Sequence, residues 1–172
     1  MLEVAIEADG EWDSSTATDR IDWAELAQAA AHAAIAESAF PQLGSGERTV
    51  ELSIRLASDD EVLALNAEWR GKDKPTNVLS FPMAEESDLA AAAEQGPELM
   101  LGDIILARGV CAVEAAEKAI PLQDHAAHLM VHGTLHLLGY DHLEEADAAD
   151  MEGREVRALA RLGISDPYAE DR

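Results

Sequence analysis

The sequence predicts an α+β fold, in which helices pack on a small mixed β-sheet. Segments that alternate apolar and polar residues, the period of half-buried strands, recur among segments with the apolar spacing of amphipathic helices. Their order is strand, helix, strand, helix, strand, strand and then three helices. With 172 residues, 48% of them hydrophobic, the chain can fill one core, so we expect a single domain over residues 1–172.

The chain is expected to open with a strand, a polar connection, a helix and a second strand. Residues 2–7 alternate apolar and acidic, as a strand would, and the polar segment 9–19 is expected to be a mobile connection. Asp22 and Glu25 form a capping pair for an alanine-rich helix. The segment 50–56 alternates regularly and predicts a half-buried strand.

The middle of the chain is expected to add a short helix and two strands. The segment 58–61 has the residue types of a capping box and opens a helix that delivers Arg70 at its end. Apolar runs near 78–83 and 101–107 predict strands. The acidic segment 85–98 between them is expected to be a variable loop.

Three helices are expected to complete the chain. Residues 109–119 form the first, Pro121 interrupts the pattern, and a more apolar helix follows at 122–138. An amphipathic helix is expected at 144–162, and the tail after Gly163 is expected to be frayed.

Composition limits the possible functions. The chain has 12 Lys and Arg against 35 Asp and Glu, a net charge of −23, so non-specific adhesion to nucleic acid should be weak. The single Cys111 excludes an intramolecular disulfide and a thiolate metal cluster. The amino terminus lacks the pattern of a signal peptide and the longest apolar stretch is too short to span a membrane, so we expect a cytoplasmic location.

The motif HGTLHLLGYDH has the spacing of a three-histidine metal site. His132 and His136 stand four residues apart, so on a helix they share one face about 6 Å apart along the axis. Gly139 can end that helix, and the following turn can bring His142 back toward the same point. Three protein ligands leave a fourth position open for water, as in catalytic zinc sites. The sequence therefore predicts one bound Zn²⁺.

The same spacing occurs in metzincin proteases, but with one difference. Those enzymes have a glutamate after the first histidine, which serves as general base, and here that position is Gly133. Peptide hydrolysis is therefore disfavoured. Three neutral imidazoles leave the full charge on zinc, so a bound water can ionise near neutral pH. Such a cationic centre suits an anionic substrate such as a phosphodiester.

A basic segment stands out in the acidic chain. Residues 70–82 carry a net charge of +2, from Arg70, Lys72 and Lys74 against Asp73, which is where a polyanion would be received. Arg70 suits a forked contact with two phosphate oxygens or the stabilisation of transition-state charge. Lys72 and Lys74 are candidate contacts to the flanking backbone of the substrate.

Three segments resemble the YbeY family of bacterial endoribonucleases. They are HLMVHGTLHLLGYDH at 128–142, LNAEWRGKDKPTNVLSFP at 65–82 and LGDIIL at 101–106. Members of this family are metal-dependent, single-strand-specific ribonucleases in ribosomal RNA processing, including maturation of the 3′ end of 16S RNA, and in ribosome quality control. The family fold agrees with the predicted α+β architecture.

The resemblance also implies residue roles. His132, His136 and His142 match the zinc ligands of the family, and Arg70 matches its invariant arginine, to which a catalytic role is assigned. It implies that zinc-bound water or hydroxide attacks the phosphodiester while Arg70 stabilises the transition state. It further implies single-stranded ribosomal RNA as substrate and the ribosome, or proteins associated with it, as partners.

Two other functions stay open. A metal-dependent hydrolase of another class, such as a peptidase or amidase, would share the histidine spacing but needs a base that Gly133 cannot supply. In a non-catalytic alternative, zinc only stabilises the fold and the protein binds a ribosomal partner during assembly.

Two neighbours of the motif have undecided roles. His128, one turn before His132, is either a partner behind the ligands, a substrate contact or a packed side chain. Asp141 either orients a ligand imidazole through its second ring nitrogen or caps the turn.

Overall fold

A four-stranded mixed sheet organises the fold, which a computed structural model describes for residues 1–12, 21–72, 76–90 and 98–169. The strands are β1 (Leu2–Ala8), β2 (Val50–Ala57), β3 (Val78–Pro82) and β4 (Leu99–Ala107). Their order in the sheet is β1-β2-β4-β3, with β2 parallel to both β1 and β4, and β3 antiparallel to β4 at one edge. The predicted α+β fold with a small mixed sheet is confirmed.

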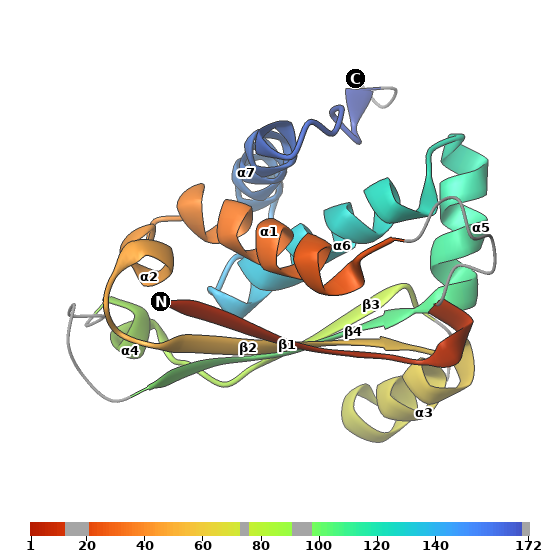
Figure 1. Cartoon of the computed structure of the whole chain (residues 1–172), viewed down its shortest axis with the longest axis horizontal. Helices are drawn as coiled ribbons and strands as arrows, with labels where there is room; N and C mark the ends of the chain where they lie inside the picture. The colour runs from red at the N-terminus through yellow and green to blue at the C-terminus, as the bar shows by residue number, and fades with distance from the viewer. Residues whose placement is uncertain (13–20, 73–75, 91–97, 170–172) are drawn as a thin grey trace.

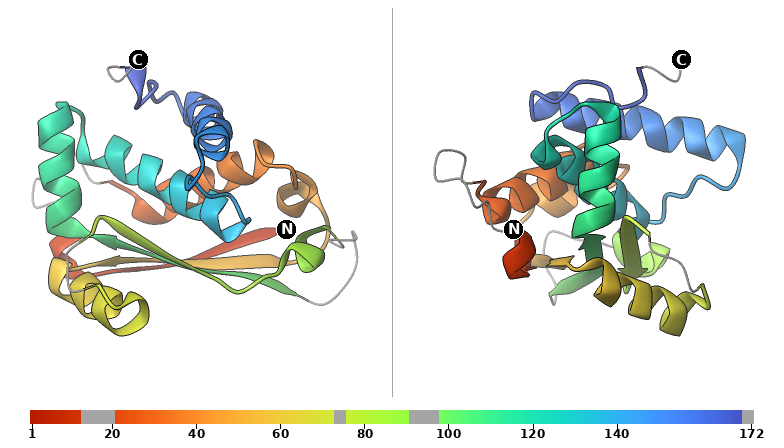
Figure 2. Two further views of the ribbon diagram at one scale, coloured as in Figure 1. Left: turned by 180° about the vertical axis from the view of Figure 1, so that it is seen from behind. Right: turned by 90° about the vertical axis from the view of Figure 1, so that its right-hand side faces the viewer.

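Helices cover the two faces of this sheet unequally. The helices of the described residues are η1 (Gly10–Trp12), α1 (Trp23–Ala36), α2 (Gln42–Ser45), α3 (Asp59–Arg70), α4 (Glu86–Ala90), α5 (Arg108–Lys118), α6 (Leu122–Leu137) and α7 (Glu145–Arg161). Helices α1 and α6 lie on one face, α7 packs over them, and α3 lies against the other face (Figures 1 and 2). None of the described helices is both long and apolar enough to cross a bilayer.

The capping hydrogen bonds predicted at the starts of two helices are present in the structure. The Asp22 side chain accepts from the Glu25 amide at 3.0 Å, and the Ser58 hydroxyl accepts from the Glu61 amide at 3.2 Å. The Glu61 carboxylate does not complete the capping box, because it binds the Arg55 guanidinium of β2 instead. The caps therefore set α1 and α3 where the sequence places them.

Two segments are more ordered than expected. In the connection 9–19, residues 10–12 form η1, and Trp12 is buried with its indole donating to the Ala57 carbonyl at 2.9 Å. The rest of that connection lies outside the described residues. In the expected loop 85–98, α4 buries Leu89 in the main core, while 91–97 are likewise not described. In both segments a single large apolar side chain reaches the core and orders the backbone around it.

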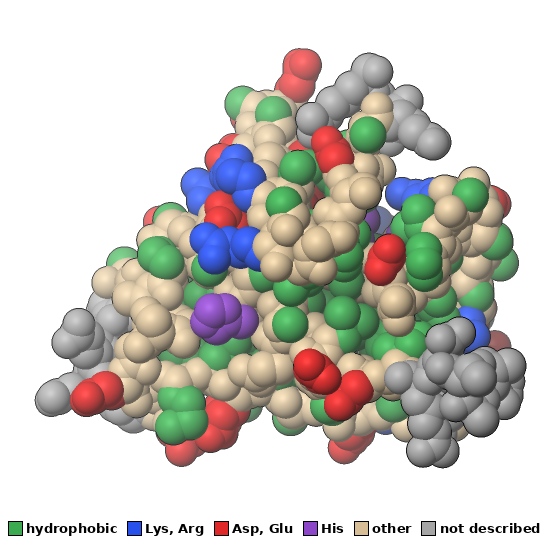
Figure 3. Space-filling model, turned by 45° about the horizontal axis from the view of Figure 1, so that its top comes forward, with side chains coloured by type: hydrophobic (Ala, Val, Ile, Leu, Met, Phe, Trp, Pro, Cys, Tyr) green, Lys and Arg blue, Asp and Glu red, His purple; other side chains and the backbone are tan. Residues whose placement is uncertain are grey.

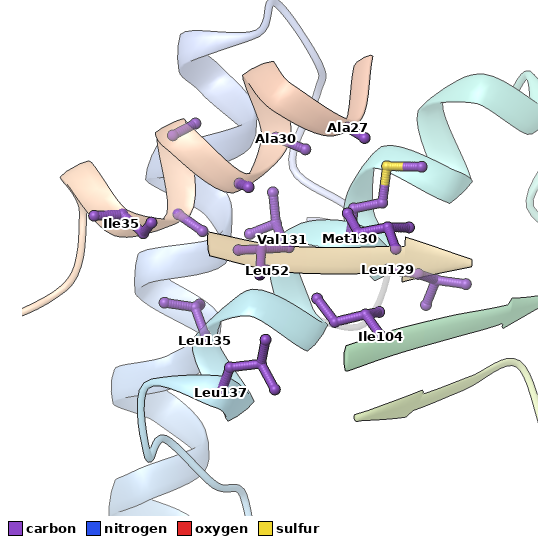
Figure 4. Close-up of a cluster of buried hydrophobic side chains, with 14 of the residues drawn as sticks. Ala27, Ala30, Ile35, Leu52, Ile104, Leu129, Met130, Val131, Leu135 and Leu137 are labelled. Carbon is purple, nitrogen blue, oxygen red and sulfur yellow. The ribbon is translucent and has the colours of Figure 1, made fainter. Parts of the chain in front are cut away.

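The main core lies between the sheet and the layer formed by α1 and α6 (Figure 4). On α1 this core is made mostly of alanines, which let the helix lie close to its neighbours, while α6 supplies larger side chains such as Leu129 and Met130. At Gly133, a Cβ atom would lie only 2.8 Å from Cγ2 of Ile104 in β4. The glycine therefore allows α6 to approach the sheet closely.

Helix α7 is fixed to the end of α1 by arginines. Arg157 and Arg161 bind the two oxygens of the Glu37 carboxylate, and Arg154 donates to the Glu37 carbonyl. The hydrogen bond and charge of Arg161, followed by those of Arg157, lower the pKa of Glu37 despite partial burial. Figure 3 shows basic side chains gathered beside acidic ones on this face of the molecule. These contacts hold α7 in the orientation in which its buried side chains face α6.

Candidate metal centre

The end of α6 is built to turn the chain back. Gly139 adopts a φ of +95°, and its amide bonds to the His136 carbonyl while the Tyr140 amide bonds to the Leu135 carbonyl. These two bonds are those of a Schellman motif, in which a glycine accepts the left-handed conformation. The predicted role of Gly139 as the helix stop is confirmed. The turn brings His142 beside the histidines of α6.

Three histidines meet at one point. His132, His136 and His142 each offer one ring nitrogen, and these nitrogens lie within 4.8 Å of one another. His132 and His136 are partly buried, and His142 is exposed at the surface. The structure therefore brings together the three residues that the sequence predicts as ligands.

Hydrogen bonds determine which ring nitrogen of each α6 histidine faces the shared point. The His136 Nδ1 lies 2.8 Å from the Tyr140 carbonyl, which can only accept, so this nitrogen carries the proton. The His132 Nδ1 lies 2.8 Å from the buried Glu155 carboxylate and is likewise the donor. In a neutral imidazole the other nitrogen is then an unprotonated acceptor.

The two acceptors face each other. The His132 and His136 Nε2 atoms are 2.9 Å apart, and two lone pairs at that distance cannot form a hydrogen bond with one another. Burial, followed by the charge of His132, lowers the pKa of His136 to about 4, so this ring is neutral at physiological pH. A cation between the rings would satisfy both nitrogens, and the donor set of three imidazoles fits a zinc-like ion.

A buried carboxylate stands behind the site. Glu155 of α7 is 1% exposed, and its Oε1 atom accepts from His132 and, at 3.0 Å, from the Nε2 atom of His128. Burial acts to raise the pKa of Glu155, but the hydrogen bonds from His128 and His132 outweigh it and lower the pKa to about 2. The carboxylate is therefore ionised and orients the His132 ring.

The two undecided neighbours of the motif now have contacts. His128 is buried and shares Glu155 with His132, so it is a partner behind the ligands. Asp141 accepts from the Leu143 amide at 3.4 Å, which favours the turn-capping alternative. The carboxylate that orients a ligand is Glu155 and not Asp141.

Arg70 lies on the same cleft as the histidines. The cleft has a volume of about 510 Å³, and its walls come from the end of α3, from β3, and from α6 with the turn after it. An Arg70 Nη2 atom donates to the Ser80 carbonyl at 2.6 Å, and the guanidinium lies 5.6 Å from the centre of the Phe81 ring. Gly71, with a φ of +64°, ends α3 immediately after this arginine. Arg70 is thus held at the edge of the sheet by β3.

Of the two lysines predicted to contact the substrate, the structure describes one. Lys72 lines the cleft together with Arg70, and its backbone amide bonds to the Asn66 carbonyl. Lys74 lies outside the described residues. The cleft also contains Asn66, a buried polar side chain on α3 that no sequence pattern indicated.

Glu155 was missed by reasoning from the sequence, although a signal existed. It lies in the apolar stripe of α7 between Met151 and Leu159, where an acidic residue is out of place. Tyr168 was missed too, and the expectation of a frayed tail is wrong up to residue 169. The Tyr168 hydroxyl donates to the Glu155 Oε2 atom at 2.9 Å. This contact with a buried carboxylate holds the segment after Gly163 against the rest of the protein.

Fold and site together define a class of protein in which three histidines, placed so that they could hold a metal ion, open onto a cleft beside a fixed arginine. The sequence model described as "Endoribonuclease YbeY" matches residues 11–163. The chain belongs to the YbeY family, as the sequence motifs predict.

Curated relatives agree with this assignment over most of the chain. An Endoribonuclease YbeY from Rhizorhabdus wittichii is 53% identical over 98% of both chains. One from Novosphingobium aromaticivorans is 56% identical over 88% of this chain and 89% of its own. One from Sphingopyxis alaskensis is 48% identical over 99% of both.

A solved structure supports the fold. The solution structure of a protein from Thermotoga maritima aligns with a TM-score of 0.54, covering 95% of this chain and 92% of its own. The two sequences are 22% identical, so this likeness concerns the arrangement of the elements alone.

Proposed function

We propose that this protein is a metal-dependent endoribonuclease that cuts single-stranded RNA during ribosomal RNA processing. The proposal depends most on one observation. The unprotonated Nε2 atoms of His132 and His136 lie 2.9 Å apart, and both residues line the same cleft as Arg70. The name shared by the curated relatives supports RNA as the substrate. We propose residues 1–172 as one catalytic domain that works in the cytoplasm, where ribosomes are assembled.

The proposed metal ligands are His132, His136 and His142, and the proposed ion is Zn²⁺. A divalent ion in such a site supplies Lewis-acid activation of a water molecule and of a phosphoryl oxygen. The Tyr140 carbonyl and the Glu155 carboxylate hold the two α6 imidazoles in the tautomer that ligation needs. The chain thereby directs the unprotonated Nε2 atoms of His132 and His136 at one shared point.

Arg70 is proposed to stabilise negative charge on the scissile phosphate. One of its N–H groups is used by the Ser80 carbonyl, which anchors the guanidinium while other donors of the fork can meet phosphate oxygens. Lys72, on the same cleft, is proposed to contact the neighbouring phosphate as a point charge, and Lys74 is proposed to act similarly. Gly133 has no side chain that could accept a proton, so this position cannot serve as a general base.

The geometry favours a flexible strand. The ligand nitrogens stand in a cleft and not on a flat surface, and a rigid A-form duplex cannot bend one phosphate down to them. A ribosomal context would deliver the RNA to a protein whose charge of −23 attracts it poorly.

The test is a cleavage assay with the purified protein. Zinc-loaded protein should cut a single-stranded RNA oligonucleotide internally, a chelator should stop the reaction, and added zinc should restore it. The His132→Ala, His136→Ala double variant should bind no zinc and cut nothing. Cleavage of a peptide library in place of RNA would favour the peptidase alternative. Zinc binding without cleavage, even on ribosomal particles, would favour the assembly-factor alternative.

A further inference from the structure

We infer that Glu155 and Tyr168 are positioning residues for the metal ligand His132, so that the segment after Gly163 is part of the metal centre. This inference rests on the metal site of the proposed function but not on RNA as substrate. Neither residue belongs to the histidine motif: they lie 23 and 36 positions beyond His132 in the sequence.

The Glu155 carboxylate uses both of its oxygens. Oε1 accepts from the His132 Nδ1 atom at 2.8 Å and from the His128 Nε2 atom at 3.0 Å, and Oε2 accepts from the Tyr168 hydroxyl at 2.9 Å. The Tyr168 oxygen also lies 3.1 Å from the His128 Nε2 atom, so Glu155, His128 and Tyr168 form a closed ring of contacts, and His132 joins this ring through Glu155 Oε1. A buried carboxylate held at both oxygens has one orientation, and it imposes one orientation on the ligand ring.

Tyr168 is itself held in place. The Tyr168 amide donates to the Asp166 side chain at 2.8 Å, and the phenol ring packs edge-on against the His128 ring, with 5.3 Å between centroids. Gly163, with a φ of +75°, turns the chain after α7, and the Ile164 amide bonds back to the Leu159 carbonyl. The turn after α7 and the Asp166 contact therefore aim the hydroxyl at Glu155. Burial, together with the charge of Glu155, raises the pKa of Tyr168, which keeps it a donor.

The physical consequence is a coupling between the tail and the metal. Without the Tyr168 hydroxyl, one buried carboxylate oxygen loses its donor, and the side chain of Glu155 is no longer restricted to the rotamer that meets His132. Carboxylates behind a ligand histidine contribute about 10- to 100-fold to metal affinity. The Tyr168 hydroxyl contacts Glu155 and not His132 itself, so it should contribute less to the metal affinity than the carboxylate does.

The experiment measures zinc affinity by competition with a chelator of known affinity, on the full chain. Glu155→Gln should bind zinc about tenfold or more weakly than the parent. Tyr168→Phe, which removes only the hydroxyl, should weaken binding by a factor of about three. The control is Thr134→Val on α6, which removes a buried hydroxyl that donates to the Met130 carbonyl and has no contact with Glu155, so this variant should keep the affinity of the parent.

A second readout separates positioning from general stability. The imidazole N–H proton of His132, observed by NMR on ¹⁵N-labelled protein, should shift in Tyr168→Phe and stay in Thr134→Val. The inference is overturned if Tyr168→Phe has the zinc affinity and the His132 resonance of the parent, or if Thr134→Val lowers the affinity equally. A parent protein that binds no zinc at all would instead contradict the proposed function.

Discussion

At the scale of the residue, the tautomers of two histidines decide what the site can hold. A backbone carbonyl and a buried carboxylate each take one N–H, and both remaining nitrogens point at the same place. A pair of packed histidines would have one nitrogen donating to the other. The hydrogen bonds around the rings, and not the rings alone, therefore indicate a cation.

Arg70 should matter to the reaction and not to the fold. In Arg70→Ala, RNA cleavage should fall roughly a hundredfold or more, as when one donor to a developing anion is lost, while zinc content and the unfolding midpoint stay near those of the parent. Arg70→Lys should restore little, because a point charge cannot reproduce the fork. Steady-state cleavage rates together with metal analysis measure both effects.

The control for this variant is Arg108→Ala, which removes the same charge from a side chain that lies over Trp12 rather than on the cleft. It should cleave as the parent does. Full activity of Arg70→Lys would contradict the bidentate role.

Cys111 should be chemically inert in the folded protein. Burial, followed by the charges of Glu114 and Asp59, raises the pKa of its thiol to about 12, so almost no thiolate exists at pH 8. Iodoacetamide at pH 8 should leave the native protein unmodified over hours and should alkylate it quickly in denaturing urea, as mass spectrometry can follow. Rapid labelling without urea would mean that the packing around α5 opens readily.

At the scale of the element, the close approach of α6 to β4 depends on Gly133. Gly133→Ala should destabilise the protein by about 1 kcal/mol, since overpacking against Ile104 costs about 1–3 kcal/mol and the gain in helix propensity returns at most about 1 kcal/mol. Urea denaturation of zinc-free protein measures the difference in the free energy of unfolding.

Gly153→Ala on α7 is the matched control, because its Cβ would meet only the flexible end of Arg157, at 3.3 Å. That variant should be neutral or stabilised by up to about 1 kcal/mol. If the two variants unfolded at the same urea concentration, the contact with Ile104 would not limit how closely α6 can approach β4.

At the scale of the whole molecule, the charge distribution predicts how RNA binding depends on salt. The described cleft holds Arg70 and Lys72, and with Lys74 no more than about three phosphates can be neutralised. The logarithm of the binding constant should therefore fall with the logarithm of salt concentration with a slope of about −2 or shallower. Fluorescence anisotropy with the cleavage-deficient His136→Ala protein, which keeps Arg70, Lys72 and Lys74, measures the slope. A slope near −5 would require a basic surface elsewhere on the chain.

The architecture was largely predictable because it depends on local patterns. Alternation in β1 and β2, the caps at Asp22 and Ser58, and the glycine that ends α6 are all statements about neighbouring residues. Short additional elements such as α4 were not, because a four- or five-residue helix has too few turns to produce a periodic signal and depends on a single buried side chain.

The sequence by itself determined the mixed α+β fold, the meeting of three histidines across a helix and its following turn, and the arginine at the end of a helix, since each of these follows from spacing along the chain. Only the tertiary structure decided which residues stand behind the ligands. Glu155 and Tyr168 reach His132 because α7 is docked on α1 by its arginines and the chain then turns back at Gly163. No spacing rule joins residues on separate elements, because their distance is set by how whole helices pack and not by the geometry of one helix.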